Sequence, residues 1–336
     1  MATMGDIAKA VGVSKTTVTN VFSGKANVSM AMRQRIQQYA EEIGYRPNML
    51  ARSLAKGKTF MIGLVVRDLD NPFYPEVADA VANFARESNY QTLLCTTGEN
   101  QELGRQQLER LVSQWVDGCL IMDRTLDLAM IEQYFHQGLP LVLCDWQLQE
   151  VPAQIPQVRG DFFRAGVLAA QHLLDLGHRD IAVIVDQPGQ ILRLQGFCSV
   201  LQQAGVSLSD GMLEQGNSTL ADGYTATKRL LARPTHPTAI FASTDMMAIG
   251  ALDALIDEGL RVPQDVSLIG LDNIIVSSYI RPTLTSIAIP KDQLARESLT
   301  LLFEQIQKTV KPDAPKLHLV EPRLVVRQST AGPKLP

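Results

Sequence analysis

The residues best suited to binding chemistry are aspartates that stand at or just past the ends of short apolar runs. There are seven of them: Asp68, Asp123, Asp145, Asp161, Asp186, Asp245 and Asp272. In open parallel sheets the carboxyl ends of the strands form the crevice where ligands bind. Carboxylates accept hydrogen bonds from hydroxyl groups, so the set predicts a site for a polyhydroxylated ligand.

Arginines near these positions supply the opposite charge. Arg193, with Arg67 or Arg124, is suited to pair with the carboxylates or to hold an anionic group of the ligand. Each single aspartate is also consistent with a helix N-cap or a turn, which is the interpretation we favour for Asp123 and Asp245 taken alone.

A second group of polar residues lies near the amino end, at Lys15, Thr16, Thr17 and Asn20. Asn makes bidentate contacts to adenine, Lys reaches guanine acceptors, and Thr offers a hydroxyl and a methyl group. On one face of a helix these side chains predict contacts in the major groove of DNA. The alternative is a three-helix protein-interaction domain with a solvated polar face.

The elements that would position this second group are three short helices. Apolar residues at helical spacing predict a helix from Met4 to Val11, with Gly12 as its stop. Ser14 is placed to cap a helix over residues 15–22, and Ser29 to cap one that runs to residue 43. The spacing is typical of an all-α helix-turn-helix head.

Residues 47–58 connect this head to a different kind of sequence. Pro47 is a good first residue for a helix and Gly57 a good stop, so residues 48–56 predict about two and a half turns. A helix of this length is too short to be stable alone in water. We expect a partner outside the chain to order it; the alternative is a flexible linker.

Charge divides the chain at the same place. Residues 1–60 hold nine Lys or Arg against three Asp or Glu, a balance of +6, whereas the remainder holds 22 against 32, a balance of −10. The asymmetry favours a basic module for a polyanion attached to a body with another function.

The body alternates short apolar runs with amphipathic helical segments. The runs predict buried strands at 62–66, 92–95, 119–122, 141–144, 181–185, 239–242 and 266–269. The segments predict helices at 74–88, 102–115, 163–176, 192–204 and 245–258. This alternation predicts parallel sheets with helices on both faces, in two α/β lobes that the chain connects across residues 150–159.

Other functional classes are disfavoured. The four cysteines show no CxxC spacing, the five histidines are scattered, and no GxGxxG, P-loop, GxSxG or HExxH pattern occurs. We therefore expect no cofactor, no metal and no enzyme activity. No charged-then-apolar leader opens the chain and no apolar run reaches the roughly 18 residues of a membrane span, so we expect a cytoplasmic protein without membrane contact.

The head and the connecting segment resemble the LacI/GalR family of bacterial transcription regulators. The matching motifs are Asp6-Ile7-Ala8, Gly12-Val13-Ser14, Thr17-Val18-Thr19, Val28-Ser29, Gly44-Tyr45, Pro47-Asn48 and Ala51-Arg52-Ser53-Leu54. The resemblance implies that Lys15 and Thr16 read bases and that Asn48, Ala51 and Arg52 belong to a hinge helix in the minor groove. Leu54 matches the leucine that wedges into the central base step. Thr19-Asn20 replaces the family's usual Ser-Arg.

The body resembles the family's effector-binding core, which is similar to periplasmic sugar-binding proteins. Matching stretches include Asn71-Pro72-Phe73-Tyr74, Arg193-Leu194-Gln195-Gly196-Phe197, Asp245-Met246-Met247-Ala248 and Gly270-Leu271-Asp272-Asn273. The resemblance implies that Phe73 and Tyr74 wall the ligand, that Asp145 and Asp272 accept hydroxyls, and that Arg193 is the main donor.

Two positions depart from this pattern. Thr244 stands where relatives often have Asn, and Ser218 stands where several have an aromatic residue. The stacking wall would then be weaker here, or be supplied by Trp146 or Phe162 instead. The resemblance also implies three crossovers between the lobes and dimerisation along the core. No apolar heptads follow Val326, so we expect a homodimer.

We therefore predict a DNA-binding domain at 1–46, a hinge helix at 47–58 and a two-lobed effector-binding and dimerisation core at 59–336. The predicted function is a repressor of carbohydrate-catabolism genes. Its affinity for a near-palindromic operator would be switched by a monosaccharide or sugar acid. The alternatives are a regulator that responds to purines or another metabolite and, outside this class, a carbohydrate-active enzyme.

Overall fold

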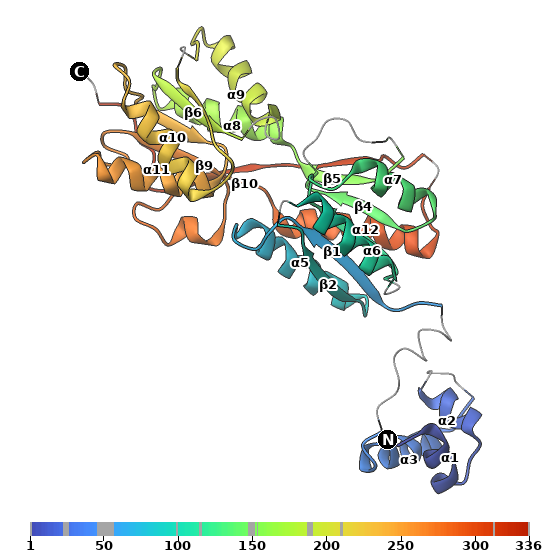
Figure 1. Ribbon diagram of the computed structural model, residues 1–336. Coiled ribbons are helices and arrows are strands. Elements are labelled where there is room, and N and C mark those ends of the chain that lie inside the picture. The colour runs from blue at the N-terminus through green and yellow to red at the C-terminus, as the bar shows by residue number, and fades with distance from the viewer. Residues whose placement is uncertain are drawn as a thin grey trace. The chain divides into compact units, whose positions relative to one another are not determined.

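The computed structural model describes residues 2–22, 27–45, 57–98, 100–113, 116–146, 152, 154–186, 191–208, 211–311 and 313–334. The chain divides into two compact units, Met1–Phe60 and Met61–Pro336 (Figure 1). The predicted hinge residues Asn48, Ala51, Arg52 and Leu54 lie outside the described residues.

The first unit contains the three predicted helices, α1 (Met4–Val11), α2 (Lys15–Phe22) and α3 (Met30–Glu42). Helix α1 begins at a capping box in which Thr3 and Asp6 each accept a hydrogen bond from the other's backbone N–H. It ends at Gly12, whose φ of 74° lies in the left-handed region that glycine adopts freely. Ser29 caps α3. Local sequence signals therefore set the ends of these helices.

A small apolar core holds the three helices together. Its buried residues come from all three helices: Ile7, Ala8, Val11, Val18, Val21, Ile36 and Ala40. Arg33 of α3 also donates to the Val21 carbonyl at the end of α2, at 3.1 Å. Such a bond satisfies a carbonyl that the helix itself leaves without a partner, so α2 is held from both its core face and its carboxyl end.

The second unit contains two six-stranded sheets, one in each lobe. The first sheet has the order β11-β5-β4-β3-β1-β2 and all its neighbours are parallel. Its strands are β1 (Met61–Val66), β2 (Gln91–Thr96), β3 (Gly118–Met122), β4 (Leu141–Cys144), β5 (Gln157–Gly160) and β11 (Leu317–Val320).

The second sheet has the order β12-β10-β9-β8-β6-β7 and is parallel except for β12, which runs antiparallel to β10. Its strands are β6 (Ile181–Val185), β7 (Leu213–Gln215), β8 (Ala239–Ala242), β9 (Ser267–Asp272), β10 (Thr285–Ala288) and β12 (Arg323–Val325). The predicted parallel α/β class is confirmed, with this single antiparallel edge strand.

Helices cover both faces of each sheet (Figure 1). The first lobe has α5 (Phe73–Glu87), α6 (Gln101–Ser113), α7 (Leu128–His136) and α12 (Lys291–Gln307). The second lobe has α8 (Phe162–Asp175), α9 (Ile191–Gln203), α10 (Leu220–Leu231) and α11 (Asp245–Asp257). Among the described residues, no helix combines the length and the apolarity that a membrane crossing requires.

Two glycines let α8 and α9 approach each other closely. A Cβ atom added to Gly166 would lie 2.0 Å from the carbonyl oxygen of Arg193, and one added to Gly196 would lie 2.0 Å from that of Phe163. Any side chain at either position would push the two helices apart. The position of Arg193 is therefore fixed by its contact with α8.

The chain crosses between the lobes three times. It leaves the first sheet after β5 at Gly160, returns between β10 and α12 through Ile289 and Pro290, and leaves again between β11 and β12 through Glu321 and Pro322. The crossing predicted at 150–159 is wrong by one strand, because residues 157–160 pair inside the first sheet as β5.

Candidate functional site

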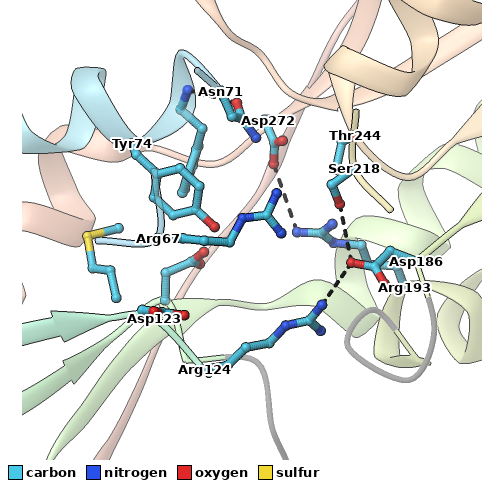
Figure 2. Close-up of a pocket in the computed structure, with 13 residues that line it drawn as sticks. Arg67, Asn71, Tyr74, Asp123, Arg124, Asp186, Arg193, Ser218, Thr244 and Asp272 are labelled. Carbon is cyan, nitrogen blue, oxygen red and sulfur yellow. Dashed lines mark hydrogen bonds and ion pairs between the residues drawn. The ribbon is translucent and has the colours of Figure 1, made fainter. Parts of the chain in front are cut away.

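A polar pocket lies between the two lobes, at the carboxyl ends of their strands. The first lobe contributes Arg67, Asn71, Phe73, Tyr74, Met122, Asp123, Arg124 and Asp145, and the second contributes Asp186, Arg193, Ser218, Thr244 and Asp272 (Figure 2). All six residues predicted to bind the effector, Phe73, Tyr74, Asp145, Arg193, Thr244 and Asp272, line this pocket.

Arg193 is a buried cation, and some of its N–H groups make no hydrogen bond to the described residues. Its side chain is 2% exposed, and its guanidinium carbon lies 4.4 Å from the centre of the Phe162 ring. Nη1 donates to the Ser243 carbonyl at 2.8 Å. Nη2 approaches Asp272 Oδ1 only to 3.9 Å, beyond hydrogen-bond distance, and Nε has no partner among the described residues. The guanidinium is thus oriented from two sides, while its Nε–Nη2 edge makes no hydrogen bond to any residue that the structure describes.

Asp272 is the acidic neighbour of this edge. It is the last residue of β9, it is 4% exposed, and its φ of 112° is unusual for a residue with a side chain. Burial raises the pKa of its carboxyl to about 8, although the positive charge of Arg193 acts in the opposite direction. Burial lowers the pKa of Arg193, whereas Asp272 raises it. A carboxyl with a pKa near 8 is mostly protonated at neutral pH and so can donate a hydrogen bond as well as accept one.

One ion pair in the pocket joins the two lobes. Nη2 of Arg124, which follows β3, donates to Oδ2 of Asp186, which follows β6, at 2.9 Å (Figure 2). Ser218 donates to the same oxygen at 3.3 Å. A ligand that needs Asp186 must compete with these two donors.

The remaining predicted residues come from strand and helix ends. Phe73 and Tyr74 begin α5, with their ring centres 5.7 Å apart, and burial raises the pKa of the Tyr74 hydroxyl. Asp145 follows β4 with a left-handed φ of 55°, and its N–H donates to Val158. The Thr244 hydroxyl accepts from the N–H of Met247 as the N-cap of α11.

Several aspartates hold the protein's own structure. The turn role favoured for Asp123 is confirmed by its bonds to Thr125. The cap or turn role favoured for Asp245 is wrong, because Thr244 is the N-cap of α11 and the partners of Asp245 lie far along the chain. Asp123 accepts from the Thr125 N–H at 2.9 Å and the Thr125 hydroxyl at 2.7 Å. Asp245 accepts from the Ile274 N–H and from two serine hydroxyls. Asp161 caps α8, and Asp68 pairs with Arg67 at 2.8 Å. Asp68, Asp161 and Asp245 are not among the pocket-lining residues, so the carboxylate cluster is smaller than the sequence suggests.

The stacking wall does not move to Trp146 or Phe162. Trp146 is 1% exposed and packs in the apolar core of the first lobe, and Phe162 lies against the guanidinium of Arg193. Sequence reasoning missed this support of Arg193 by Phe162 and the Ser243 carbonyl, because neither residue type signals such a role. It also missed Met122 in the pocket lining.

In the helix-turn-helix unit, Lys15 and Thr16 are exposed at the start of α2, and Thr17 and Asn20 are half-buried. The Ser14 hydroxyl oxygen accepts from the Thr17 N–H at 3.0 Å and lies 2.9 Å from the Thr17 hydroxyl. Ser14 therefore caps α2, and the Thr17 hydroxyl already has a protein neighbour.

A helix-turn-helix unit and a two-lobed core with a polar pocket between its lobes define a class of ligand-responsive DNA-binding regulators. Comparison with known proteins agrees with this class. Residues 3–48 match the model of bacterial regulatory proteins of the lacI family, and residues 170–330 match that of a periplasmic binding protein-like domain.

The HTH-type transcriptional repressor PurR of Pasteurella multocida is 35% identical over 334 residues, which cover 98% of each chain. The lac repressor dimer bound to operator and the anti-inducer ONPF is 25% identical, with a TM-score of 0.85 over 98% of this chain and 99% of that one. A complex of the transcriptional regulator CelR with cellobiose is 30% identical, with a TM-score of 0.73 over 98% of this chain and 100% of that one.

The chain belongs to the LacI family of bacterial regulatory proteins. The predicted family is thereby confirmed. The protein is a DNA-binding transcriptional regulator and not an enzyme, because the relatives that it matches over its whole length are transcriptional repressors.

Proposed function

We propose that the protein represses carbohydrate-catabolism genes and that a monosaccharide or sugar acid, bound between the lobes, switches its affinity for operator DNA. The observation that carries this proposal is the buried guanidinium of Arg193, whose Nε–Nη2 edge forms no hydrogen bond to a described residue. Two parallel N–H groups on that edge match a carboxylate or two adjacent hydroxyl oxygens.

The surroundings of Arg193 favour an oxygen-rich ligand. The described residues with which the second lobe lines the pocket are all polar or charged, namely Asp186, Arg193, Ser218, Thr244 and Asp272. Because the raised pKa leaves Asp272 mostly protonated at neutral pH, the charge of Arg193 is only partly compensated, which favours an anionic ligand such as a sugar acid. The cellobiose complex of the relative CelR supports a sugar.

A purine is the second candidate, and the similarity to PurR favours it. A purine ring has two faces to cover, and the rings that line the pocket, Phe73 and Tyr74, both lie on the first lobe. Among the described residues the lining thus offers an aromatic surface on one side only, which is why a sugar is our first choice.

For DNA contact we propose Lys15, Thr16, Thr17 and Asn20 of α2, together with Asn48, Ala51, Arg52 and Leu54 of the hinge. Lys15 and Thr16 are the two that the structure shows exposed at the amino end of α2, the part of a recognition helix that contacts base edges. Two heads on one near-palindromic operator require a homodimer, because protein symmetry is mirrored in the site. We place this activity in the cytoplasm.

An apolar groove on the second lobe supports the dimer. It lies along α10 and α11 and includes Leu220, Tyr224, Ile249, Leu252 and Ile256. Leu220 is 43% exposed and Ile256 is 55% exposed. Clustered exposed apolar side chains mark interaction sites, and a second copy of the chain is the partner that a two-fold operator requires.

The test begins with a thermal-shift screen of the pure protein against monosaccharides, sugar acids, sugar phosphates and purines, because a ligand that binds the folded state raises the melting temperature. We expect a shift with a sugar or sugar acid and none with purines. DNA duplexes that the protein selects from a random pool then report whether that compound changes DNA affinity. A shift with purines alone would move the proposal to the second candidate.

The hinge assignment has its own test on the same selected duplexes. Leu54→Ala is expected to weaken DNA binding while the melting temperature stays unchanged, because the role proposed for Leu54 is insertion between DNA bases. Equal affinity of the two proteins would remove Leu54 from the interface.

A further inference from the structure

A single lysine outside the pocket lining contacts residues of both lobes next to the pocket. Lys291 is the first residue of α12, directly after the chain has crossed back into the first lobe. Its side chain is 11% exposed. Lys291 is not one of the residues that line the pocket, and neither the family resemblance nor the charge pattern singles it out.

Its ammonium group makes two hydrogen bonds and one ion pair. Nζ donates to the carbonyl oxygens of Asp272 at 2.7 Å and Asn273 at 3.0 Å, and Oε2 of Glu76 lies 3.1 Å away. The ring of Phe73 lies 5.6 Å from Nζ. An ammonium group has three donors and no acceptor, and here oxygen atoms of three residues surround it.

The two carbonyls belong to a turn that needs support. Asp272 and Asn273 both have positive φ, 112° and 50°, a conformation that costs free energy for residues with side chains and persists where surrounding contacts hold it. Ser286 accepts from the Asn273 N–H at 3.0 Å, and Arg327 donates to the Asn273 side chain at 2.6 Å. Lys291 adds the contacts that come from the first lobe.

Glu76 completes the connection. It lies on α5, three residues after Phe73, and its Oε1 accepts from the N–H of Ile275 in the second lobe at 2.7 Å. The other oxygen, Oε2, faces Lys291. One carboxylate and one ammonium group therefore join the helix that carries Phe73 and Tyr74 to the turn that carries Asp272.

We propose that Lys291 and Glu76 are positioning residues that hold the two lobes closed and set Asp272 against Phe73 and Tyr74; the second part rests on the proposed function. Separation of the lobes must break the bonds from Lys291 to the Asp272 and Asn273 carbonyls and the bond from Ile275 to Glu76. The pair consequently contributes to effector affinity without touching the effector.

An ion pair with a merely structural role would affect the stability of the protein but not the contact between the lobes. The Lys228–Glu258 ion pair serves as the control for such a role. Lys228 of α10 and Glu258, next to the end of α11, both belong to the second lobe, so their ion pair cannot hold the lobes together. Lys228→Met removes the same charge and the same number of atoms as Lys291→Met.

The experiment is amide hydrogen exchange at Ile275 in the full-length protein without ligand, because this N–H donates directly across the lobes. In Lys291→Met the exchange rate at Ile275 is expected to rise about tenfold, the effect of weakening one hydrogen-bonded contact. It should rise at least as much in Glu76→Ala, which removes the acceptor, and stay unchanged in Lys228→Met. Wild-type exchange at Ile275 in a folded Lys291→Met protein would overturn the proposal.

If Lys291→Met fails to fold, Glu76→Gln decides, since it keeps an acceptor for Ile275 and loses the charge that faces Lys291. A faster rate supports the proposal and an unchanged rate overturns it. A second readout uses D-gluconate as the sugar-acid probe, whose affinity should fall about tenfold in Lys291→Met. Absence of D-gluconate binding to the wild-type protein counts against a sugar-acid effector, while the exchange rates still decide whether the pair holds the lobes.

Discussion

Replacing Gly166 by alanine should weaken effector binding, because the added methyl group would collide with the backbone of Arg193. The added Cβ would lie 2.0 Å from the Arg193 carbonyl oxygen and 2.8 Å from the Phe197 nitrogen. Ordinary contacts of a Cβ begin at 3.4 Å, so α8 and α9 must separate by the difference, 3.4 − 2.0 = 1.4 Å. Both close atoms are backbone, and no side-chain rotation relieves the contact.

This separation would carry Arg193 away from its anchor. The bond from Nη1 to the Ser243 carbonyl is 2.8 Å long, and an added 1.4 Å would stretch it beyond hydrogen-bond distance. Overpacking of this kind costs about 1–3 kcal/mol, which lowers the melting temperature of a domain of this size by about 2–10 °C. Losing the orientation of a charged donor should weaken effector binding by about 10- to 100-fold.

The assay measures thermal unfolding and the affinity for the compound that gives the largest shift in the screen. Gly104→Ala is the matched control, because the close neighbour of its added Cβ is a methyl group of the Leu126 side chain, which can move. Alanine is also a better helix former than glycine, so the control should keep its stability. A Gly166→Ala protein with wild-type stability and wild-type affinity would refute the argument.

Further predictions concern the charged groups and the recognition helix. Arg193→Lys keeps the charge and loses the bidentate edge, so effector affinity should fall at least tenfold while binding to a selected duplex stays unchanged. Because burial raises the pKa of Asp272 from 3.8 to about 8, the folded protein keeps a proton across about pH 4–8 that the unfolded chain has lost. The free energy of unfolding contributed by this group is therefore greatest below pH 4 and falls as pH rises through 8. Asp272→Asn should flatten the fall, as unfolding titrations at several pH values would show. Ser14→Ala removes the cap of α2 and should lower the stability of the head by about 1 kcal/mol. Lys15→Ala should leave stability unchanged and reduce the salt dependence of DNA binding.

The sequence predicts the helix-turn-helix unit to the residue at both ends of α1 and α2. Local signals set those ends: Thr3 and Asp6 cap the start of α1, Gly12 ends it, and Ser14 caps the start of α2. Strands that are buried on both faces, such as β4 and β6, are equally predictable, because their apolar runs are continuous.

The strands that sequence reasoning missed lack such runs. β11 at the sheet edge exposes Leu317 and Leu319, and β7 has two exposed residues of three. β5 reads as a proline-flanked connection until its pairing with β4 and β11 is known. Long-range pairing decides these elements, and the local sequence carries little trace of it.

The same limit applies to the pocket. The carboxylates at strand ends point to the correct edge of each sheet, but which of them face the cavity depends on contacts with distant residues. Asp245 accepts hydrogen bonds from Ile274, Ser277 and Ser286, which lie far along the chain. Asp272, by contrast, faces Arg193 in the pocket. The contacts of Lys291 with Asp272, Asn273 and Glu76 also join residues that are distant in the sequence.

The three crossovers also determine how this protein can be divided. The first sheet is built from residues 61–160 and 317–320, with α12 between the second and third crossovers, so neither lobe is one continuous stretch of chain. A single cut therefore releases neither lobe alone, and exchange of a lobe between relatives by one recombination event would split at least one of the two sheets. The head, which ends before the first strand, can instead be exchanged in one step. Evolution and protein engineers alike can thus alter DNA specificity as a module, whereas ligand specificity must change residue by residue within the core.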